Sequence, residues 1–159
     1  MPTKGEMRMV CENHAKQKKI VYKDLSYRIK EAALAVHRYF GPGFLEKVYE
    51  NALFCKLCRM GLPCQQQVPM KVYFEDNGDR VVVGEYIADI VVDDKIIIEV
   101  KAVSLIEKIH YIQLKNYLKA TGKRLGLLVN FGTPRLSIER VLNSRQTRLP
   151  DRQGGVGRF

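Results

Sequence analysis

The sequence predicts one domain of the α/β (α+β) class, in which helices flank a mixed β-sheet. Three observations predict this class. Two stretches with the apolar period of a helix come first, a period-two alternation begins near Gln65, and a third helical stretch then precedes an unbroken apolar run. With 159 residues and 46% apolar content, the chain is long enough to bury a real core.

Two helices are expected ahead of the first strand. The first starts at Asp24 or Ser26, either of which suits a helix cap, and runs to Phe40. Gly41-Pro42-Gly43 ends it, and a second helix covers about 44–60. The side chains expected to face the core are Leu25, Ile29, Ala32, Ala33, Val36 and Phe40 in the first helix and Leu45, Val48, Tyr49, Ala52, Leu53 and Leu57 in the second.

The middle of the chain predicts three strands. Val68, Met70, Val72 and Phe74 alternate with their neighbours, as on a half-buried strand, and Pro69 favours a position at the sheet edge. The run 76–79, Asp-Asn-Gly-Asp, is a strong hairpin signal. Further strands are expected at about 81–92 and 95–102, joined at Asp93-Asp94.

The remainder predicts an amphipathic helix at 106–120, an internal strand at 125–131 and a short element at 136–142. The strand is expected to be internal because its apolar run shows no alternation. The less polar positions of the helix are Ile109, Ile112, Leu114, Tyr117 and Leu118. The expected organisation is a flexible basic arm at 1–21, a folded domain at 22–142 and a disordered basic tail at 143–159.

The charge balance points to a polyanionic partner. Lys and Arg number 27 against 17 Asp and Glu, which gives a net charge of +10, and nucleic acid is the commonest partner of so basic a chain. Better solubility is the alternative meaning of the same charge. No apolar run approaches the roughly 20 residues of a membrane span, and no secretory signal is seen, so a cytoplasmic protein is expected.

Four cysteines raise the question of a metal cluster. Cys55 and Cys58 have C-x-x-C spacing, with Cys64 shortly after and Cys11 far upstream. The first two fall within a helical pattern, where a cysteine is most often a small buried hydrophobe. An iron–sulfur or zinc site is therefore not expected.

The most informative residues are Asp89, Glu99 and Lys101, which interrupt two otherwise apolar strands. Charges are rare on buried strands unless they are paired, bind a metal or take part in a reaction. Glu99 and Lys101 share a strand face. Asp89 joins them only if the connection at 93–95 has three residues or a bulge, because a two-residue turn would pair Asp89 with Ile98.

If these side chains converge, their chemistry is specific. Two carboxylates are hard oxygen ligands suited to Mg²⁺ or Mn²⁺, and Lys101 could hold an attacking water or a scissile phosphate. A plain ion pair is the equally weighted alternative. Glu46, at the start of a helix after a glycine-rich turn, and Gln113 with Tyr117, one turn apart on the helix after Lys101, are candidates to complete the site.

Together these motifs resemble the PD-(D/E)XK nuclease superfamily and, more closely, its GxxExxY branch, through Gly43, Glu46 and Tyr49. The resemblance also includes Gln67-Val68-Pro69 and Asn130-Phe131-Gly132, while Ala88 replaces the signature proline. It implies a restriction-endonuclease-like core. Asp89, Glu99 and Glu46 would be metal ligands, Lys101 the catalytic lysine, and Gln113 and Tyr117 the supports of the site.

The expected function is therefore Mg²⁺- or Mn²⁺-dependent cleavage of DNA, with RNA as the less favoured substrate. The alternative is a catalytically inactive nucleic-acid-binding or interaction subunit of a DNA repair or defence complex. Dimers are common among such nucleases, so a homodimer is compatible with the sequence, whereas a membrane partner is not expected.

Overall fold

The computed structural model describes residues 20–143. Most of the expected basic arm and tail, together with Cys11, lies outside these residues. The elements are α1 (Lys23–Phe40), α2 (Glu46–Arg59), β1 (Cys64–Asp76), β2 (Asp79–Val92), β3 (Ile96–Lys101), α3 (Lys108–Thr121), β4 (Leu125–Asn130) and β5 (Ser137–Leu142). None of the described helices combines the length and apolarity needed to cross a bilayer.

The five strands form one mixed sheet in the order β1-β2-β3-β4-β5. Only β3 and β4 run parallel, since α3 connects them, and the other neighbours are antiparallel. β1 lies at one edge, as Pro69 predicted, and β4 is internal and buried at every position. The predicted fold class is confirmed.

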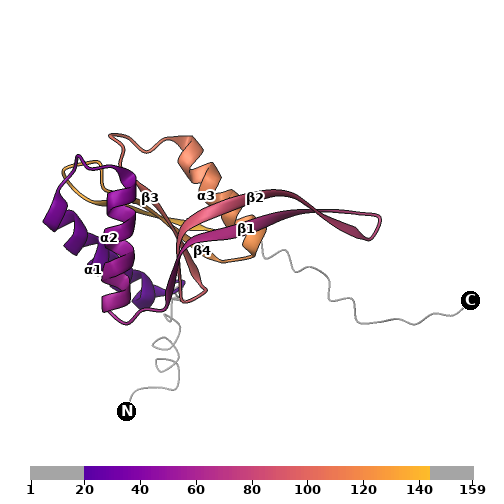
Figure 1. Cartoon of the computed structure of the whole chain (residues 1–159), viewed down its shortest axis with the longest axis horizontal. Coiled ribbons are helices and arrows are strands. Elements are labelled where there is room, and N and C mark those ends of the chain that lie inside the picture. Colours follow the sequence, from indigo (N-terminus) through magenta and orange to yellow (C-terminus); the bar gives the residue numbers. More distant parts are fainter. Residues whose placement is uncertain (1–19, 144–159) are drawn as a thin grey trace, which may run out of the picture.

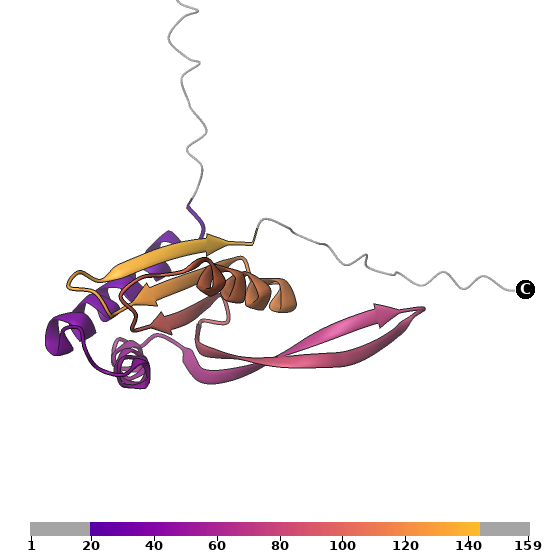
Figure 2. The ribbon, with the colours of Figure 1, turned by 90° about the horizontal axis from the view of Figure 1, so that it is seen from above.

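Helices cover both faces of this sheet (Figures 1 and 2). Ile96, Ile98 and Val100 of β3 pack into the core cluster that includes the buried stripes of α1 and α2, whereas Ile97 packs with Leu114 and Leu118 of α3. Because side chains alternate along a strand, Glu99 and Lys101 lie on the face of Ile97, the one that α3 covers. A Cβ on Gly126 of β4 would lie 2.7 Å from Leu114, so α3 packs closely against the sheet.

The ends of the first two helices differ from the prediction. α1 starts at Lys23 after a left-handed Tyr22, and the Ser26 hydroxyl donates to the Tyr22 carbonyl at 2.6 Å instead of capping the helix. Leu45 was expected to face the core but is the residue that precedes α2 and is 80% exposed. The stripe Tyr49, Leu53 and Leu57 faces the core and directs Cys55 and Cys58 to solvent, so the interpretation of these two cysteines as buried hydrophobes is wrong.

The hairpin of β1 and β2 extends well beyond the helices (Figures 1 and 2). Its two-residue turn is the predicted one, with Asp76 opposite Asp79 and both Asn77 and Gly78 at positive φ. Met70 is the last residue of β1 buried in the core, and we call residues 71–85 the arm. Phe74 lies in the arm and is 58% exposed, so the predicted half-buried alternation fails at the outer end of β1.

Candidate functional site

The connection between β2 and β3 decides whether the candidate carboxylates meet. Asp93 and Asp94 both have left-handed backbone angles, and Val92 pairs with Ile96, which leaves three residues in the connection. Ile90 therefore lies opposite Ile98, and the next position places Asp89 opposite Glu99. The Val100 amide donates a hydrogen bond to Asp89 Oδ2 at 2.8 Å. The condition set by the sequence for convergence is met.

Glu99 and Lys101 form a buried ion pair on the face that α3 covers. Lys101 Nζ lies 2.8 Å from Glu99 Oε1, and the two residues are only 8% and 3% exposed. The second carboxylate oxygen, Glu99 Oε2, is buried and has no hydrogen-bond partner within residues 20–143. Such an orphan acceptor is costly in a protein interior, and a cation is one ligand that would satisfy it.

Glu46 reaches this cluster from the first turn of α2. Its Oε1 atom lies 4.0 Å from Lys101 Nζ, and its side chain is 44% exposed. Tyr49, one turn further on, fixes the loop before α2. The Tyr49 hydroxyl donates to the Gly41 carbonyl at 2.5 Å and accepts from the Phe44 amide at 3.1 Å, while its ring stacks on Phe131. Tyr49 therefore positions Glu46 rather than entering the site.

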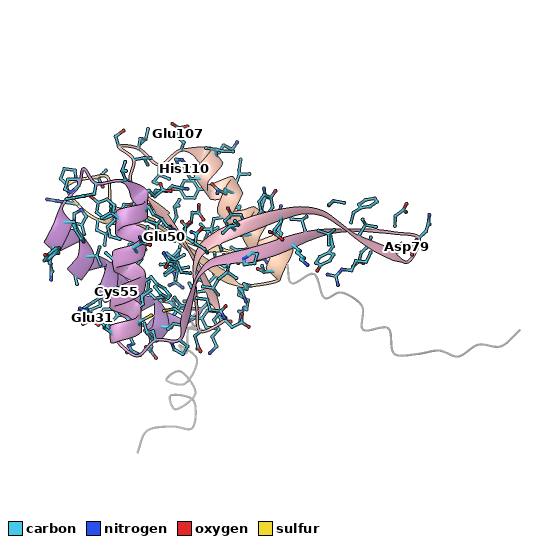
Figure 3. The ribbon with its side chains drawn as sticks, viewed as in Figure 1. Glu31, Glu50, Cys55, Asp79, Glu107 and His110 are labelled. Carbon is cyan, nitrogen blue, oxygen red and sulfur yellow. The ribbon has the colours of Figure 1, made fainter. Side chains whose placement is uncertain are left out.

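Glu50 is the residue that the sequence analysis missed. It is 3% exposed and takes hydrogen bonds from Lys47 at 2.9 and 3.0 Å, from Gln66 at 2.7 Å and from Gln67 at 2.8 Å. Gln67 has a positive φ of 54°, which is uncommon for a residue with a side chain. Figure 3 labels Glu50 on α2 next to the base of the hairpin. The four-residue spacing between Glu46 and Glu50, followed by a run of glutamines at 65–67, is the signal that could have revealed it.

Gln113 and Tyr117 of α3 face the cluster as a pair. The Gln113 amide donates to the Tyr117 hydroxyl at 2.7 Å, and the Tyr117 ring lies 5.3 Å from that of Tyr86 on β2. Burial first, and then the nearby charges of Glu99 and Asp89, raise the pKa of Tyr117. The hydroxyl that accepts from Gln113 is thus kept protonated and has its own hydrogen to donate.

Hydrogen bonds from the Asn130 side chain hold the chain directly after Lys101, at the end of β3. Asn130 Oδ1 accepts from the amides of Val103 and Gly132 at 3.0 Å each, and its Nδ2 donates to the Val103 carbonyl at 2.9 Å. A Cβ on Gly132 would lie 2.4 Å from the Val103 amide nitrogen, so this approach requires glycine. These contacts fix the strand that carries Glu99 and Lys101.

The carboxylates of the cluster hold their protons unusually tightly. Burial raises the pKa of Asp89 to about 6, with added repulsion from Glu50 and Glu46 and partial relief from the Val100 amide and Lys101. Burial, then the charge of Asp89, raises the pKa of Glu99 to about 7. For Lys101, burial favours the neutral form, but the charges of Glu99, Glu46 and Asp89 outweigh it and raise the pKa. Negative charge is in excess, and a cation would relieve it.

The donor set fits a hard divalent cation held by few protein ligands. Within the described part of the chain, no three carboxylate, imidazole or thiol groups lie close enough to hold an ion as they stand. Mg²⁺ does not require such a cage, because it is commonly bound through one or two carboxylates and keeps several waters. Asp89, opposite Glu99 in the strand register, and the orphan Glu99 Oε2 match that smaller requirement.

The cysteines lie away from this cluster, at the far end of α2. Cys55 and Cys58 are exposed, and Cys58 Sγ lies 3.4 Å from Cys64 Sγ at the start of β1. Burial, followed by the hydrogen bond from Cys58, raises the pKa of Cys64 to about 12. A thiol with so high a pKa is a poor nucleophile at neutral pH.

Comparison with known proteins gives one family. A family model described as the PD-(D/E)XK nuclease superfamily matches residues 23–141, which contain all of the candidate site residues. No curated protein matches the sequence. A solved structure titled "Crystal structure of SSO0001" is 20% identical with a TM-score of 0.49, and the match covers 74% of this chain and 60% of that one. At that score the likeness carries no argument about the fold or the site.

Proposed function

Because this chain belongs to the PD-(D/E)XK nuclease superfamily, we propose that it hydrolyses phosphodiester bonds of nucleic acid with the help of Mg²⁺ or Mn²⁺. DNA is the favoured substrate and RNA the second. The observation that carries the proposal is the meeting of Asp89 with the buried Glu99–Lys101 pair, together with Glu99 Oε2, which has no hydrogen-bond partner in the described part of the chain. A superfamily assignment alone would allow an inactive relative, so the argument depends on the site.

Asp89 and Glu99 hold the cation in this proposal, and Glu46 or the Val100 carbonyl adds a further oxygen. When bound, the cation supplies a water of lowered pKa and stabilises negative charge on the phosphate. Asp89 is already oriented by the Val100 amide. Among residues 20–143 the second oxygen of Glu99 has no hydrogen-bond partner, so it could hold a cation while Oε1 stays paired with Lys101.

Lys101 provides a positive charge next to the proposed metal ligands. Its ammonium group lies between Glu99 and Glu46 and has three N–H donors, so it can hold the attacking water or neutralise the scissile phosphate. Gln113 and Tyr117 act next to it. Since the Tyr117 hydroxyl accepts from Gln113, its proton is available to a phosphate oxygen or to a site carboxylate.

The finer assignment to the GxxExxY branch belongs to the same proposal. Gly43, Glu46 and Tyr49 form its motif. The hydrogen bonds of Tyr49 with Gly41 and Phe44 hold the loop that precedes Glu46, which gives the tyrosine of the motif a structural role. The terminal segments 1–19 and 144–159 are rich in Lys and Arg and are proposed to attract the nucleic-acid backbone without regard to its sequence. A cytoplasmic location, inferred from the sequence, completes the proposal.

The test is cleavage of plasmid, single-stranded DNA and RNA with Mg²⁺, Mn²⁺ or EDTA. We expect metal-dependent cleavage that falls by about 10²-fold or more in Asp89→Ala and Lys101→Ala, because each removes electrostatic support for the transition state. Asp24→Ala and Lys30→Ala are matched controls, since both residues are exposed on α1 and lie outside the β2–β3 connection. Equal cleavage by the Asp89→Ala and wild-type proteins would refute the assignment.

One observation favours an alternative, a nucleic-acid-binding or interaction subunit without turnover. The 2.8 Å pair of Glu99 with Lys101 occupies one of the two ligands and would remain closed in an inactive protein. This alternative expects salt-sensitive binding that survives Asp89→Ala, and no cleavage with any divalent metal. Binding and cleavage measured on the same variant separate the two functions.

A further inference from the structure

The arm, residues 71–85, is the largest feature that the proposed site does not use. In Figures 1 and 2 it projects beyond α3, and no other described element covers it. Figure 3 labels Asp79 at its tip, far from Glu50 at its base. A two-stranded ribbon has too little core to be stable alone, and a partner surface would stabilise it.

The arm exposes an unusual number of large apolar side chains. Phe74, Val81 and Val83 are 58%, 56% and 61% exposed, and Tyr73 and Val82 are 41% and 48% exposed. Phe74 and Val81 are paired and lie on one face of the arm, and Tyr73 and Val82 lie on the other, so both faces expose apolar surface. Single exposed apolar residues are ordinary on a protein surface, whereas groups of them mark a binding surface. The group continues toward the body through Tyr86 and Ile87, which are also exposed.

The charge of the arm argues against nucleic acid as its partner. It holds four carboxylates, at Glu75, Asp76, Asp79 and Glu85, and two cations, Lys71 and Arg80, within a chain of net charge +10. Arg80 is already engaged, 3.4 Å from Glu75 and 3.8 Å above the Tyr73 ring. The tip is therefore acidic and apolar, and a polyanion would be repelled there.

A groove at the other edge of the sheet carries positive charge, which complements the acidic tip of the arm. It lies between α3 and β5, has a volume of about 610 Å³, and includes Lys115 and Lys119. Its remaining lining is mixed, with apolar surface from Tyr111, Leu118, Val141 and Leu142 and polar surface from Arg140 and Asn143. β5 is an edge strand, so its outer backbone groups are also open to a partner. Positive charge beside apolar surface matches the acidic, apolar tip.

We propose that two copies of the chain exchange arms, each arm lying in the α3–β5 groove of the other copy. An arm cannot serve its own groove, because its tip lies beyond the end of α3 in both views (Figures 1 and 2). Mutual exchange buries both apolar surfaces and closes the assembly as a two-fold dimer. Tyr86 at the base of the arm contacts Tyr117 of the candidate site. Through this contact, the exchanged arm would connect each candidate site to the dimer interface.

A charge swap tests this pairing. The arm variant carries Asp76→Lys and Asp79→Lys, and the groove variant carries Lys115→Glu and Lys119→Glu. In sedimentation velocity we expect the full-length wild-type chain to move as a dimer at micromolar concentration and each variant as a monomer. An equimolar mixture of the two variants should regain the dimer, because each reversed arm then meets an oppositely charged groove, and high salt should weaken all of these dimers.

Further variants test whether the loss of the dimer comes from misfolding and whether the arm binds something other than the α3–β5 groove. Recovery of the dimer on mixing shows that both variants are folded, and Tyr39→Asp, at an aromatic residue that is 83% exposed on α1, should leave the wild-type dimer intact. Phe74→Ser should weaken the dimer without changing any charge. A wild-type chain that stays monomeric, or a mixture that fails to recover the dimer, would overturn the proposal. So would a Phe74→Ser variant that stays dimeric but loses DNA binding, which would make the arm a contact for nucleic acid.

Discussion

The two ends of β2 depart in opposite ways from the usual pattern of buried apolar and exposed charged side chains. At the inner end, the half-buried Asp89 lies beside Glu99 and Lys101, which are buried, although charges are rare in a protein interior. At the outer end, Val81, Val82 and Val83 lie in water, although they are apolar. Each arrangement costs folding free energy in the isolated chain. The partners proposed above, a cation and a phosphate at the inner end and a protein surface at the outer end, would each offset this cost.

This contrast separates two kinds of functional signal. A buried charge can be stabilised by few kinds of partner, because the partner must have a particular sign, size and geometry. The inner end therefore restricts its ligand to a narrow class. Exposed apolar surface accepts many partners, and only the accompanying charge narrows the choice. The predictions below test the contrast by applying similar changes at both ends.

The largest effect is expected when a carboxylate is neutralised at each end. Glu99→Gln should lower nuclease activity by about 10²-fold or more, because it removes a ligand charge from the buried cluster. Glu75→Gln, the same change in the arm, should leave the rate of cleavage per active site nearly unchanged. Metal-dependent plasmid cleavage at saturating substrate measures both. Similar losses in the two variants would remove the distinction between the ends.

The pH dependence of stability should come from the inner end. The pKa values of Asp89 and Glu99 in the folded protein, about 6 and about 7, lie above their ordinary values, so the folded state holds protons more tightly than the unfolded chain. Their stabilising contribution is full below their unfolded pKa values and is lost as the pH rises through about 7. Urea denaturation of the metal-free protein should show a loss on the order of 2 kcal/mol between acidic and mildly alkaline pH.

Two further measurements sharpen this prediction. The double variant Asp89→Asn with Glu99→Gln should flatten the pH dependence, whereas Asp76→Asn should leave it unchanged. Added Mg²⁺ should stabilise the protein more at higher pH, because the cation competes with protons for the same carboxylates. A metal effect that is independent of pH would mean that the ion binds elsewhere.

A smaller effect is expected for Tyr49→Phe. The variant keeps the ring stacked on Phe131 but loses the hydroxyl contacts with Gly41 and Phe44, which should cost about 1 kcal/mol of unfolding free energy. Activity should fall several-fold, because Glu46 follows directly after that loop. Tyr39→Phe on the exposed face of α1 is the matched control for thermal unfolding and should show no change.

The smallest effect is expected for Val81→Thr in the arm. The change is nearly isosteric and the site is 56% exposed in the single chain, so in the background of the monomeric groove variant the free energy of unfolding should change by no more than about 0.5 kcal/mol. The same substitution at Val129, which is fully buried in β4, should cost about 1–3 kcal/mol, because it buries a hydroxyl. Equal costs at the two positions would mean that the arm is packed against the body in solution.

The sequence could predict the inner end better than the outer end. Charges within apolar strands stand out in any sequence, so Asp89, Glu99 and Lys101 were found as candidates. Whether they meet depends on the length of the connection at 93–95, and Asp93-Asp94 is compatible with both a two- and a three-residue turn. Glu50 was missed because a polar residue on an amphipathic helix looks exposed until the helix is placed against β1.

The outer end was misjudged for a different reason. Alternation of Val72 and Phe74 indicates a strand with one apolar face, but periodicity does not say whether anything covers that face. Coverage depends on the short length of β3 and on where α3 ends, which are properties of the whole fold. The Asn77-Gly78 turn was predicted from local conformation alone and is confirmed.

The strand register that places Asp89 opposite Glu99 has a consequence for how such a gene tolerates change in length. Loss of one codon within 90–92, with the connection kept, would move Asp89 opposite Ile98 and turn its carboxylate to the other face of the sheet, while most backbone pairing could re-form. Loss of a matched pair of residues near Asn77 would only shorten the arm. Among related genes, small insertions and deletions should therefore accumulate at the hairpin tip and be purged from residues 90–92 and 96–98, where the number of residues decides which face of the sheet carries the candidate carboxylates.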